Sequence, residues 1–325
     1  MHLGPLVRVE RAAPVPIGRE IRVRVSVCGV CRTDLHLAEG DLRPHLPGAI
    51  PGHEIVGIVD RVGDRAERFS LGDRVGIAWL RRTCGTCRWC AAGHENLCLD
   101  PRFTGWDADG GYADNAVVDE RYAYRIPDVF DDHTAAPLLC AGIIGYRALR
   151  RAELPAGGRL GIYGFGASAH LAAQIALADG ATVHVMTRSA DARQFALDLG
   201  AASAGGAHDP PPEPLDSAIL FAPAGELVPA ALAALDRSGT LAVAGIHLSE
   251  IPALDYQRHL FQERQLRSVT ANTRTDGEEF LERAARIGIR VETTLYAFED
   301  ADKALIDLAN DRVRGAAVID VHPDG

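Results

Sequence analysis

Polar and apolar residues alternate along the first third of the chain, at the two-residue period of a half-buried β-strand. The alternation is clearest over residues 20–27, EIRVRVSV, and two further β-rich segments follow at 54–62 and 73–79. Turn residues such as Gly63-Asp64 separate these segments. The pattern therefore predicts a β-rich, turn-rich and barrel-like domain over about the first 125 residues.

The pattern changes near residue 140, where short apolar strands begin to alternate with helical segments. Strands are predicted at 159–165, 181–187, 217–222 and 239–246, and helices at 167–180, 190–201 and 227–236. Such alternation predicts a parallel sheet with helices on both faces. The prolines at 210–214 predict a loop within this domain. After residue 271 the pattern loosens into helices at 277–286 and 299–310 and strands at 291–298 and 315–321.

Composition fits a two-domain globular protein, because the chain has 325 residues, 47% of them hydrophobic and 24% charged. A formal net charge of -10 argues against a nucleic-acid surface, which needs a basic footprint. No apolar run approaches the roughly 18 residues of a membrane helix, and residues 1–10 lack the apolar core of a signal peptide. We therefore expect a cytoplasmic protein that binds neither nucleic acid nor membranes.

Seven cysteines carry the strongest chemical signal, and their odd number disfavours a disulfide framework. Four of them, Cys84, Cys87, Cys90 and Cys98, follow the pattern C-x2-C-x2-C-x7-C. Two-residue gaps let one loop wrap three thiolates around an ion, and tetrahedral Zn²⁺ takes four thiolates with no position left open. We therefore predict a structural zinc. The alternatives are unligated thiols or an iron–sulfur cluster, which uses a different fourth ligand followed by proline.

Three more zinc-type ligands, Cys31, His53 and Cys140, are scattered along the chain. Two thiolates and one imidazole from distant points can hold a metal and leave one position open for water or substrate. Spacing alone does not join these residues, because a lone cysteine or histidine is most often a core residue. The remaining thiol, Cys28, is expected to be a small core residue.

Five motifs occur in one order along the chain: CGVCRTDLH (28–36), PGHE (51–54), the four-cysteine segment (84–98), PLLCAG (137–142) and GFGASA (164–169). Together they resemble the zinc-containing alcohol dehydrogenases of the medium-chain dehydrogenase/reductase family, over roughly residues 20–320. The resemblance implies an α/β protein of two domains. A GroES-like, β-rich catalytic domain would span 1–141 and 272–325 with the structural zinc lobe at 80–100, and a Rossmann domain with a doubly wound parallel sheet would span 142–271.

The resemblance also implies roles for individual side chains. Cys31, His53 and Cys140 match the family's catalytic zinc ligands, and Glu54 matches a carboxylate that can approach the metal. Four polar residues match supporting positions: Asp34 orients the ligand histidine, Thr33 bonds the substrate oxygen, His36 ends the proton relay, and Arg32 contacts the cofactor pyrophosphate. Asp34 and His36 would otherwise be a solvated loop pair.

The implied reaction is hydride transfer between an alcohol or aldehyde and a nicotinamide cofactor, with two zinc ions per chain. Zinc would polarise the substrate oxygen, and the proton would leave through Thr33, a cofactor ribose hydroxyl and His36. Rival interpretations are a zinc-free quinone or enoyl reductase on this fold, and a non-catalytic zinc-stabilised binding protein. Both predict the loss of ligands, relay residues or the cofactor motif, and the sequence retains them all.

The cofactor motif is the glycine turn between the predicted strand and helix near residue 165. Gly164 and Gly166, with Ala169 in the third position, form G-x-G-x-x-A, and Ala167 and Ser168 open the helix whose N–H groups would face the pyrophosphate. The next strand ends in Thr187, Arg188 and Ser189, where an NAD enzyme would carry a carboxylate. We therefore expect NADP(H) to be favoured over NAD(H). Alternatively, Arg188 stacks on adenine and NAD is used.

One phosphate contact of the family is missing. The family often has an arginine directly after the glycine near the C-terminus, and here Ala316 follows Gly315. Part of the phosphate binding is therefore expected either to be missing or to be supplied by Arg274 or Arg314.

The expected substrate is a small alcohol or aldehyde. Trp79 matches an aromatic pocket wall, and Leu42 stands where some ethanol-preferring members carry tryptophan. The smaller Leu42 predicts room for medium-sized aliphatic or aromatic primary alcohols, unless both residues are ordinary core packing. By analogy with the family we also expect a homodimer or homotetramer, joined through edge strands of the cofactor domain such as 239–248 and the segment after it.

Overall fold

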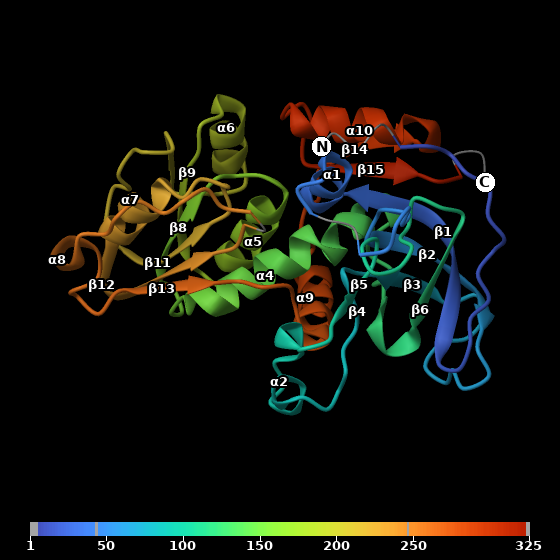
Figure 1. Ribbon diagram of the computed structural model, residues 1–325. Coiled ribbons are helices and arrows are strands. Elements are labelled where there is room, and N and C mark those ends of the chain that lie inside the picture. Colours follow the sequence, from blue (N-terminus) through green and yellow to red (C-terminus); the bar gives the residue numbers. More distant parts are fainter. Residues whose placement is uncertain (1–5, 43–44, 246, 323–325) are drawn as a thin grey trace. The chain divides into compact units, whose positions relative to one another are not determined.

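The computed structural model describes residues 6–42, 45–245 and 247–322, which divide into two compact units (Figure 1). The first unit consists of Met1–Cys140, Ala271–Ala285 and Arg290–Gly325, and the second of Ala141–Thr270 and Arg286–Ile289. The second unit is thus an insertion in the chain of the first.

A seven-stranded sheet forms the centre of the first unit, in the order β14-β15-β1-β2-β3-β7, with β6 also paired to β1. Its strands are β1 (Glu20–Val30), β2 (Glu54–Val62), β3 (Arg74–Ile77), β6 (Asn115–Asp119), β7 (Ala123–Arg125), β14 (Thr293–Ala297) and β15 (Ala316–Asp320). Alternate residues of β1, namely Ile21, Val23 and Val25, are completely buried. The alternation in the sequence therefore corresponds to one face of this sheet, which packs into the core of the unit.

Short helices and one hairpin complete the first unit. The helices are α1 (Arg32–Glu39), α2 (Arg88–Ala91), α3 (Asp132–Ala135), α9 (Arg274–Ile287) and α10 (Ala301–Ala309), and the 3-10 segments are η1 (Glu95–Leu97), η2 (Glu120–Tyr122), η3 (Ala136–Leu139) and η4 (Phe298–Asp300). The hairpin pairs β4 (Leu80–Arg82) with β5 (Arg102–Phe103). The segment between these two strands carries the four clustered cysteines.

The second unit is built on a six-stranded, entirely parallel sheet in the order β10-β9-β8-β11-β12-β13. Its strands are β8 (Arg159–Tyr163), β9 (Thr182–Met186), β10 (Ser203–Gly205), β11 (Leu215–Leu220), β12 (Leu235–Val243) and β13 (Gln265–Ser268). In chain order this is the 3-2-1-4-5-6 arrangement of dinucleotide-binding sheets, whose ligands bind where the order reverses. The reversal lies between β8 and β11, and the glycine turn directly follows β8.

Helices cover both faces of this parallel sheet, as predicted. They are α4 (Ala141–Ala152), α5 (Ala167–Ala178), α6 (Ala190–Asp198), α7 (Leu227–Ala234) and α8 (Tyr256–His259). Leu160 and Ile162 of β8 pack in a cluster with alanines of α4, α5 and α6. Tyr163, with the opposite parity, packs in a second cluster with α7. The doubly wound architecture expected from the sequence is therefore confirmed.

The predicted strands and helices are present, with bounds shifted by a few residues, and the prolines at 210–214 lie in a loop. The last residue of the strand predicted at 239–246 lies outside the described residues. Among the described residues, five α-helices were not predicted: α1, α4 and the four-residue helices α2, α3 and α8. The short α1 is mostly polar, and α4 contains Gly142 and Gly145, which disfavour a helix.

The two segments expected at the oligomer contact differ in their place in the parallel sheet. Residues 239–243 belong to β12, which pairs with β11 on one side and β13 on the other, so it offers no free edge. The outer strand of the sheet is β13, in the segment that follows. Within the ranges described, no helix is both long and apolar enough to cross a bilayer.

Candidate active site and structural metal centre

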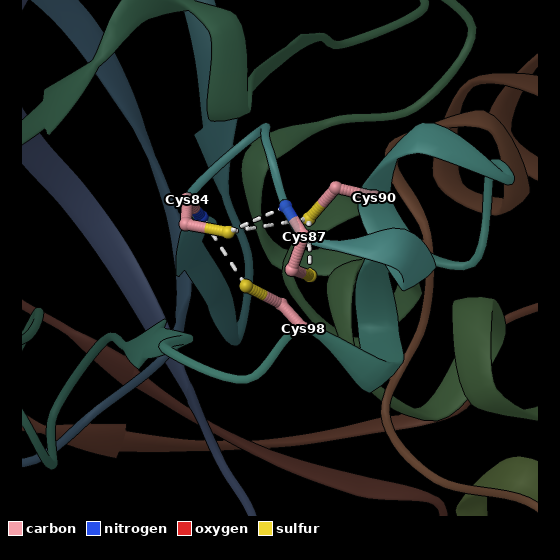
Figure 2. Close-up of side chains that lie close together, drawn as sticks. All are labelled: Cys84, Cys87, Cys90 and Cys98. Carbon is pink, nitrogen blue, oxygen red and sulfur yellow. Dashed lines mark hydrogen bonds between the residues drawn. The ribbon is translucent and has the colours of Figure 1, made fainter.

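Cys84, Cys87, Cys90 and Cys98 bring their sulfur atoms within 4.8 Å of one another (Figure 2). The Sγ atoms of Cys84 and Cys90 lie 3.9 Å apart and those of Cys87 and Cys90 lie 3.6 Å apart, and all four thiols are free. A tetrahedron with Zn–S bonds of about 2.3 Å has edges of about 3.8 Å. The four sulfurs therefore already have the spacing that a zinc ion requires.

Backbone N–H groups point at the sulfur atoms of Cys84 and Cys98. The N–H of Cys87 donates to Cys84 Sγ at 3.3 Å, and the N–H of Cys84 donates to Cys98 Sγ at 3.2 Å. Hydrogen bonds from the N–H groups of Thr86 and Cys87 lower the pKa of the Cys84 thiol to about 6. A loop that stabilises thiolates in this way fits a metal rather than a set of neutral thiols.

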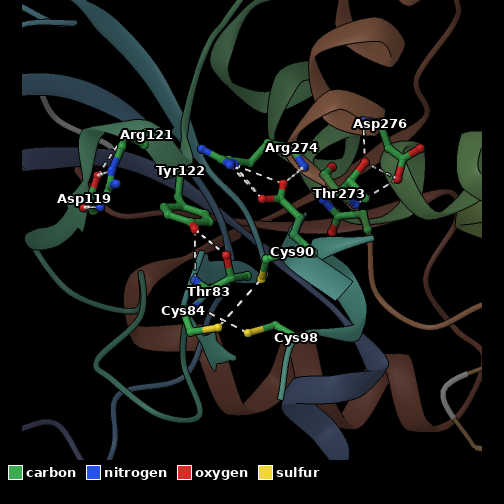
Figure 3. Close-up of polar contacts among 12 residues, drawn as sticks. Thr83, Cys84, Cys90, Cys98, Asp119, Arg121, Tyr122, Thr273, Arg274 and Asp276 are labelled. Carbon is green, nitrogen blue, oxygen red and sulfur yellow. Dashed lines mark hydrogen bonds and ion pairs between the residues drawn. The ribbon is translucent and has the colours of Figure 1, made fainter. Parts of the chain in front are cut away.

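An ion pair joins the four-cysteine lobe to the start of α9 (Figure 3). Glu95, whose side chain is 11% exposed, accepts hydrogen bonds from Nε and Nη2 of Arg274 at 3.0 and 2.7 Å and from its backbone N–H at 2.7 Å. The guanidinium also lies over the Tyr122 ring, 4.8 Å from its centre. Tyr122 Oη in turn meets the backbone N–H of Thr83 at 2.9 Å, directly before Cys84.

This arrangement bears on the expected phosphate contacts. Arg274 is held by Glu95 at α9, whose first turn is capped by hydrogen bonds between Thr273 and Asp276. It is therefore engaged within the lobe network. Arg314 is 77% exposed and lies 3.6 Å from Glu292.

A second ligand cluster forms where three chain segments end. Cys31 lies between β1 and α1, His53 directly precedes β2, and Cys140 follows η3. Their ligand atoms, together with a carboxylate oxygen of Glu54, all lie within 4.8 Å of one another. The Sγ atoms of Cys31 and Cys140 are 3.7 Å apart, again close to the edge of a zinc tetrahedron. The structure thus brings together the three residues that spacing alone could not join.

His53 is 1% exposed, and neither ring nitrogen has a hydrogen-bond partner among the described residues. Nδ1 faces Asp34 at 3.3 Å, which leaves Nε2 for another ligand. A buried, unpaired ring nitrogen beside two thiols costs free energy unless something binds it. This donor set fits a zinc ion.

Asp34 fixes the segments that carry these ligands. Its carboxylate accepts hydrogen bonds from the backbone N–H groups of Cys31 at 2.9 Å and Gly52 at 3.0 Å, in addition to facing His53. Burial alone would lower the pKa of His53, but the Asp34 carboxylate raises it well above its usual value. Burial raises the pKa of Glu54 well above its usual value. Asp34 therefore connects the segments that carry Cys31, Gly52 and His53.

The predicted relay residues lie on α1, three positions apart and so on one side of the helix. Thr33 is buried, with Oγ1 3.7 Å from Cys31 Sγ. His36 is 19% exposed, and its Nδ1 lies 3.0 Å from Asp41 Oδ2. Arg32, on the same helix, is about half exposed and pairs with Asp311 at 2.6 Å. Thr33 is thus near the ligands and His36 near the surface.

Of the two predicted pocket residues, Trp79 lies beside the ligand cluster. Its ring centre is 4.8 Å from that of His53, with the two planes at 69°. Leu42 is partly buried, and its backbone N–H donates to the carbonyl of His36. Cys28 is completely buried in the core, as predicted.

The glycine turn of the second unit has the features of a phosphate cradle. Gly164 adopts φ +84°, and a Cβ there would approach the backbone N of Ala222 within 2.8 Å, so only glycine fits. Gly166 differs, because its φ of -120° suits any residue and a Cβ would meet nothing within 4 Å. Gly166 is exposed at the N-terminus of α5, ahead of Ala167 and Ser168. The open space above these N–H groups suits a pyrophosphate.

Two arginines, Arg188 and Arg193, lie near the end of β9, and the sequence predicted a role only for Arg188. Thr187 is buried, and Ser189 caps α6 by accepting from Ala192, whereas Arg188 is exposed. Arg193 donates from Nη1 to the carbonyls of Thr187 and Arg188, at 3.0 and 2.9 Å. Its position in the first turn of α6, the helix that follows β9, was the available signal.

Comparisons with known proteins agree with this geometry. Residues 18–128 match the alcohol dehydrogenase GroES-like domain. The chain is 59% identical over 324 residues to a probable alcohol dehydrogenase of Mycobacterium tuberculosis, covering 98% of this chain and 94% of the relative.

Two solved structures extend the comparison. The cinnamyl alcohol dehydrogenase of Sorghum bicolor superposes with a TM-score of 0.88 at 29% identity, covering 97% of this chain and 94% of that one. CAD from Helicobacter pylori, complexed with NADP(H), superposes with a TM-score of 0.85 at 28% identity, covering 95% and 92%.

The lobe contact generates a first prediction. Replacing Arg274 with methionine leaves the buried Glu95 carboxylate without its cation, so we expect a loss of about 2 kcal/mol in the free energy of unfolding. Chemical denaturation monitored by circular dichroism measures this loss. The double variant Arg274→Met with Glu95→Gln removes the buried charge as well and should recover part of it. Equal stability of the single variant and the wild type would contradict the assignment.

Proposed function

Because this chain belongs to the zinc-containing alcohol dehydrogenases of the medium-chain dehydrogenase/reductase family, we propose that Cys31, His53 and Cys140 hold a catalytic zinc and that the four-cysteine lobe holds a structural one. The chain is an oxidoreductase that moves a hydride between an alcohol or aldehyde and a nicotinamide cofactor. The observation that carries the zinc proposal is the buried His53 ring with no hydrogen-bond partner among the described residues, beside two thiols 3.7 Å apart.

The two clusters would have different roles, one structural and one catalytic. Four thiolates complete a tetrahedron, so the ion of the lobe would only hold the loop together. Two thiolates and one imidazole leave a position open, and Glu54 is the carboxylate near enough to approach that position. Zinc bound there would supply a Lewis acid that polarises the substrate oxygen and lowers the pKa of an alcohol.

The chain's own residues would hold the ligands and move the proton. Asp34 would keep His53 in one orientation, with Nδ1 toward the carboxylate. Thr33, buried next to Cys31, would orient the substrate hydroxyl through its own hydroxyl. His36, partly exposed and paired with Asp41, would exchange the proton with solvent.

The cofactor proposal concerns the second unit. The N–H groups at the start of α5, above Gly166, would bind the pyrophosphate. Arg188, exposed at the end of β9, would pair with a 2′-phosphate, which favours NADP(H) over NAD(H). The Helicobacter pylori relative was solved with NADP(H), which supports this choice. Arg32, a residue of the first unit, would also bind the pyrophosphate of the cofactor.

Trp79, beside His53, and Leu42 would line the substrate site, with medium-sized aliphatic or aromatic primary alcohols as substrates.

Zinc-binding thiolates are favoured in a reducing compartment, and all seven cysteines are free. We therefore propose that the protein acts in the cytoplasm. Strand β13 ends the parallel sheet, with Leu266 37% exposed. A second copy would pair with this edge to form a homodimer, or a homotetramer built from two dimers.

Activity with alcohols tests the proposed function. The wild type should reduce NADP⁺ in the presence of medium-sized primary alcohols, and Cys31→Ala should lose about 1,000-fold in kcat/KM, because it removes a ligand of the Lewis acid. Cys28→Ala is the matched control. It removes a thiol buried in the core three residues away and should keep its activity within about fivefold. Equal activity of the Cys31 variant and the wild type would rule out the zinc assignment.

Cofactor preference is tested by comparing kcat/KM for NADPH and NADH in aldehyde reduction. We expect NADPH to be favoured, and Arg188→Ala to lower kcat/KM for NADPH by about 10-fold or more, because a charged hydrogen bond is lost. The value for NADH should hardly change, which makes NADH the internal control. A wild type that favours NADH, or a variant that loses both cofactors equally, would overturn this assignment.

A further inference from the structure

Gly29 is a glycine inside a strand that has neighbours on both sides. It lies in β1, opposite Val318 of β15 and opposite Glu54 of β2. Glycine weakens the interior of a strand, so a glycine there often marks a place where another group comes close. The φ angle of Gly29 is not positive, so its backbone conformation would accept any residue. The need for glycine at this position therefore comes from its surroundings.

The side chain of Glu54 fills the space at Gly29. A Cβ on Gly29 would lie 2.7 Å from Cδ and 2.8 Å from Cβ of Glu54, and closer still to its Oε2. These three atoms are the nearest ones, and all lie within the 3.0 Å that real Cβ atoms do not cross. The carboxyl group of Glu54 thus lies across β1, at the place that any larger residue would occupy.

The space at Gly29 is on the side of β1 that carries the Cys31 thiol. Residues two apart along a strand share a face, and so do opposite residues of an antiparallel pair. Cys31 follows Gly29 by two positions and keeps an extended backbone, with φ -111° and ψ 158°. A carboxylate oxygen of Glu54 lies within 4.8 Å of the ligand atoms of Cys31, His53 and Cys140. Glu54 therefore reaches the open cluster by crossing Gly29.

Glu54 has little freedom to leave this place. It is 3% exposed, and the next residue of β2, Ile55, is completely buried in the core of the unit. A buried carboxylate needs a cation or hydrogen-bond donors to offset its lost hydration. A Zn²⁺ ion in the open cluster would be such a cation, and a side chain at position 29 would push the carboxylate away from it.

We propose that Gly29 is a positioning residue of the open cluster. The space that it leaves in β1 holds the Glu54 carboxylate against the Cys31, His53 and Cys140 side chains, and this placement strengthens the binding of zinc there. This inference rests on the proposed function. The four-cysteine lobe takes no ligand from β1 or β2, so its ion should not respond to a change at position 29.

Competition with a chromogenic chelator measures the zinc affinity of each cluster in the two-zinc protein. The Cys140→Ser variant identifies the signal of the open cluster, because it lacks a ligand there. We expect Gly29→Ala and Glu54→Gln each to weaken zinc binding in the open cluster about 10-fold, since losing a group that supports the ligands typically costs about 10- to 100-fold in metal affinity. Zinc in the lobe is the internal control and should keep its wild-type affinity.

The double variant separates a positioning role from a general loss of packing. If Gly29 acts through the Glu54 carboxylate, Gly29→Ala should change the zinc affinity by less than about twofold once Glu54 is replaced by glutamine. Independent effects would instead multiply to about 100-fold. With Co²⁺ in place of zinc, the visible absorption of the open cluster should shift in Gly29→Ala as it does in Glu54→Gln, because it reports the ligands around the ion.

Gly161→Ala is the matched control. Gly161 is also a strand glycine without a positive φ, in β8, and a Cβ there would collide with the side chain of Leu215, which is no ligand of either cluster. Its zinc affinities should equal those of the wild type.

A swap variant, Gly29→Ala with Glu54→Gly, covers the case in which Gly29→Ala alone does not fold. It removes the three atoms nearest to the new Cβ, so it should fold and bind zinc as weakly as Glu54→Gln. A swap variant that does not fold would overturn the proposal, because Gly29 would then be needed for a reason other than Glu54.

Each contrary result has a separate meaning. A wild type whose open cluster binds no zinc contradicts the proposed function and this inference with it. An open cluster that binds zinc equally well in the wild type, Gly29→Ala and Glu54→Gln contradicts this inference alone. Effects of the two variants that multiply in the double variant contradict the positioning role.

Discussion

The close approach of thiol sulfurs that form no disulfide is the constraint on which the first unit depends. Sulfur atoms lie 3.6–3.9 Å apart in the lobe and 3.7 Å apart in the open cluster. Thiolates at such distances repel one another unless a cation lies between them, and both spacings match a zinc tetrahedron. Polar residues around each cluster hold the cysteine-bearing segments in place. Asp34 fixes two ligand segments, and Glu95 with Arg274 fixes the lobe.

The two clusters differ in how the chain delivers their ligands, and this difference explains their chemistry. The lobe takes all four ligands from one short segment, so an ion bound there would have no position open for a substrate. The open cluster collects Cys31, His53 and Cys140 from the ends of three elements that belong to one unit. Trp79 and Thr33 lie beside these ligands.

Much of the fold could be predicted from the sequence, because period and turn chemistry are local. The alternation of residues 20–27 gave β1, and the switch to strands alternating with helices gave the parallel sheet. The four-cysteine lobe was equally local. The open cluster was not, since Cys31 and Cys140 are 109 positions apart and only resemblance joined them. The stacking of Phe103 and Trp106 with Trp79 was missed, because ring planes are set by tertiary packing that no spacing encodes. The pairing of Arg274 with Glu95 was missed for the same reason.

The metal content of purified variants tests the central claim most directly. Elemental analysis of the wild type should find two zinc ions per chain, and both Cys98→Ser and Cys140→Ser should retain one, because each removes a ligand of one cluster only. The two variants should then differ, with Cys98→Ser losing thermal stability and Cys140→Ser losing activity while remaining folded. A wild type with a single zinc that Cys140→Ser does not remove would contradict the account, since the open cluster would then hold no metal.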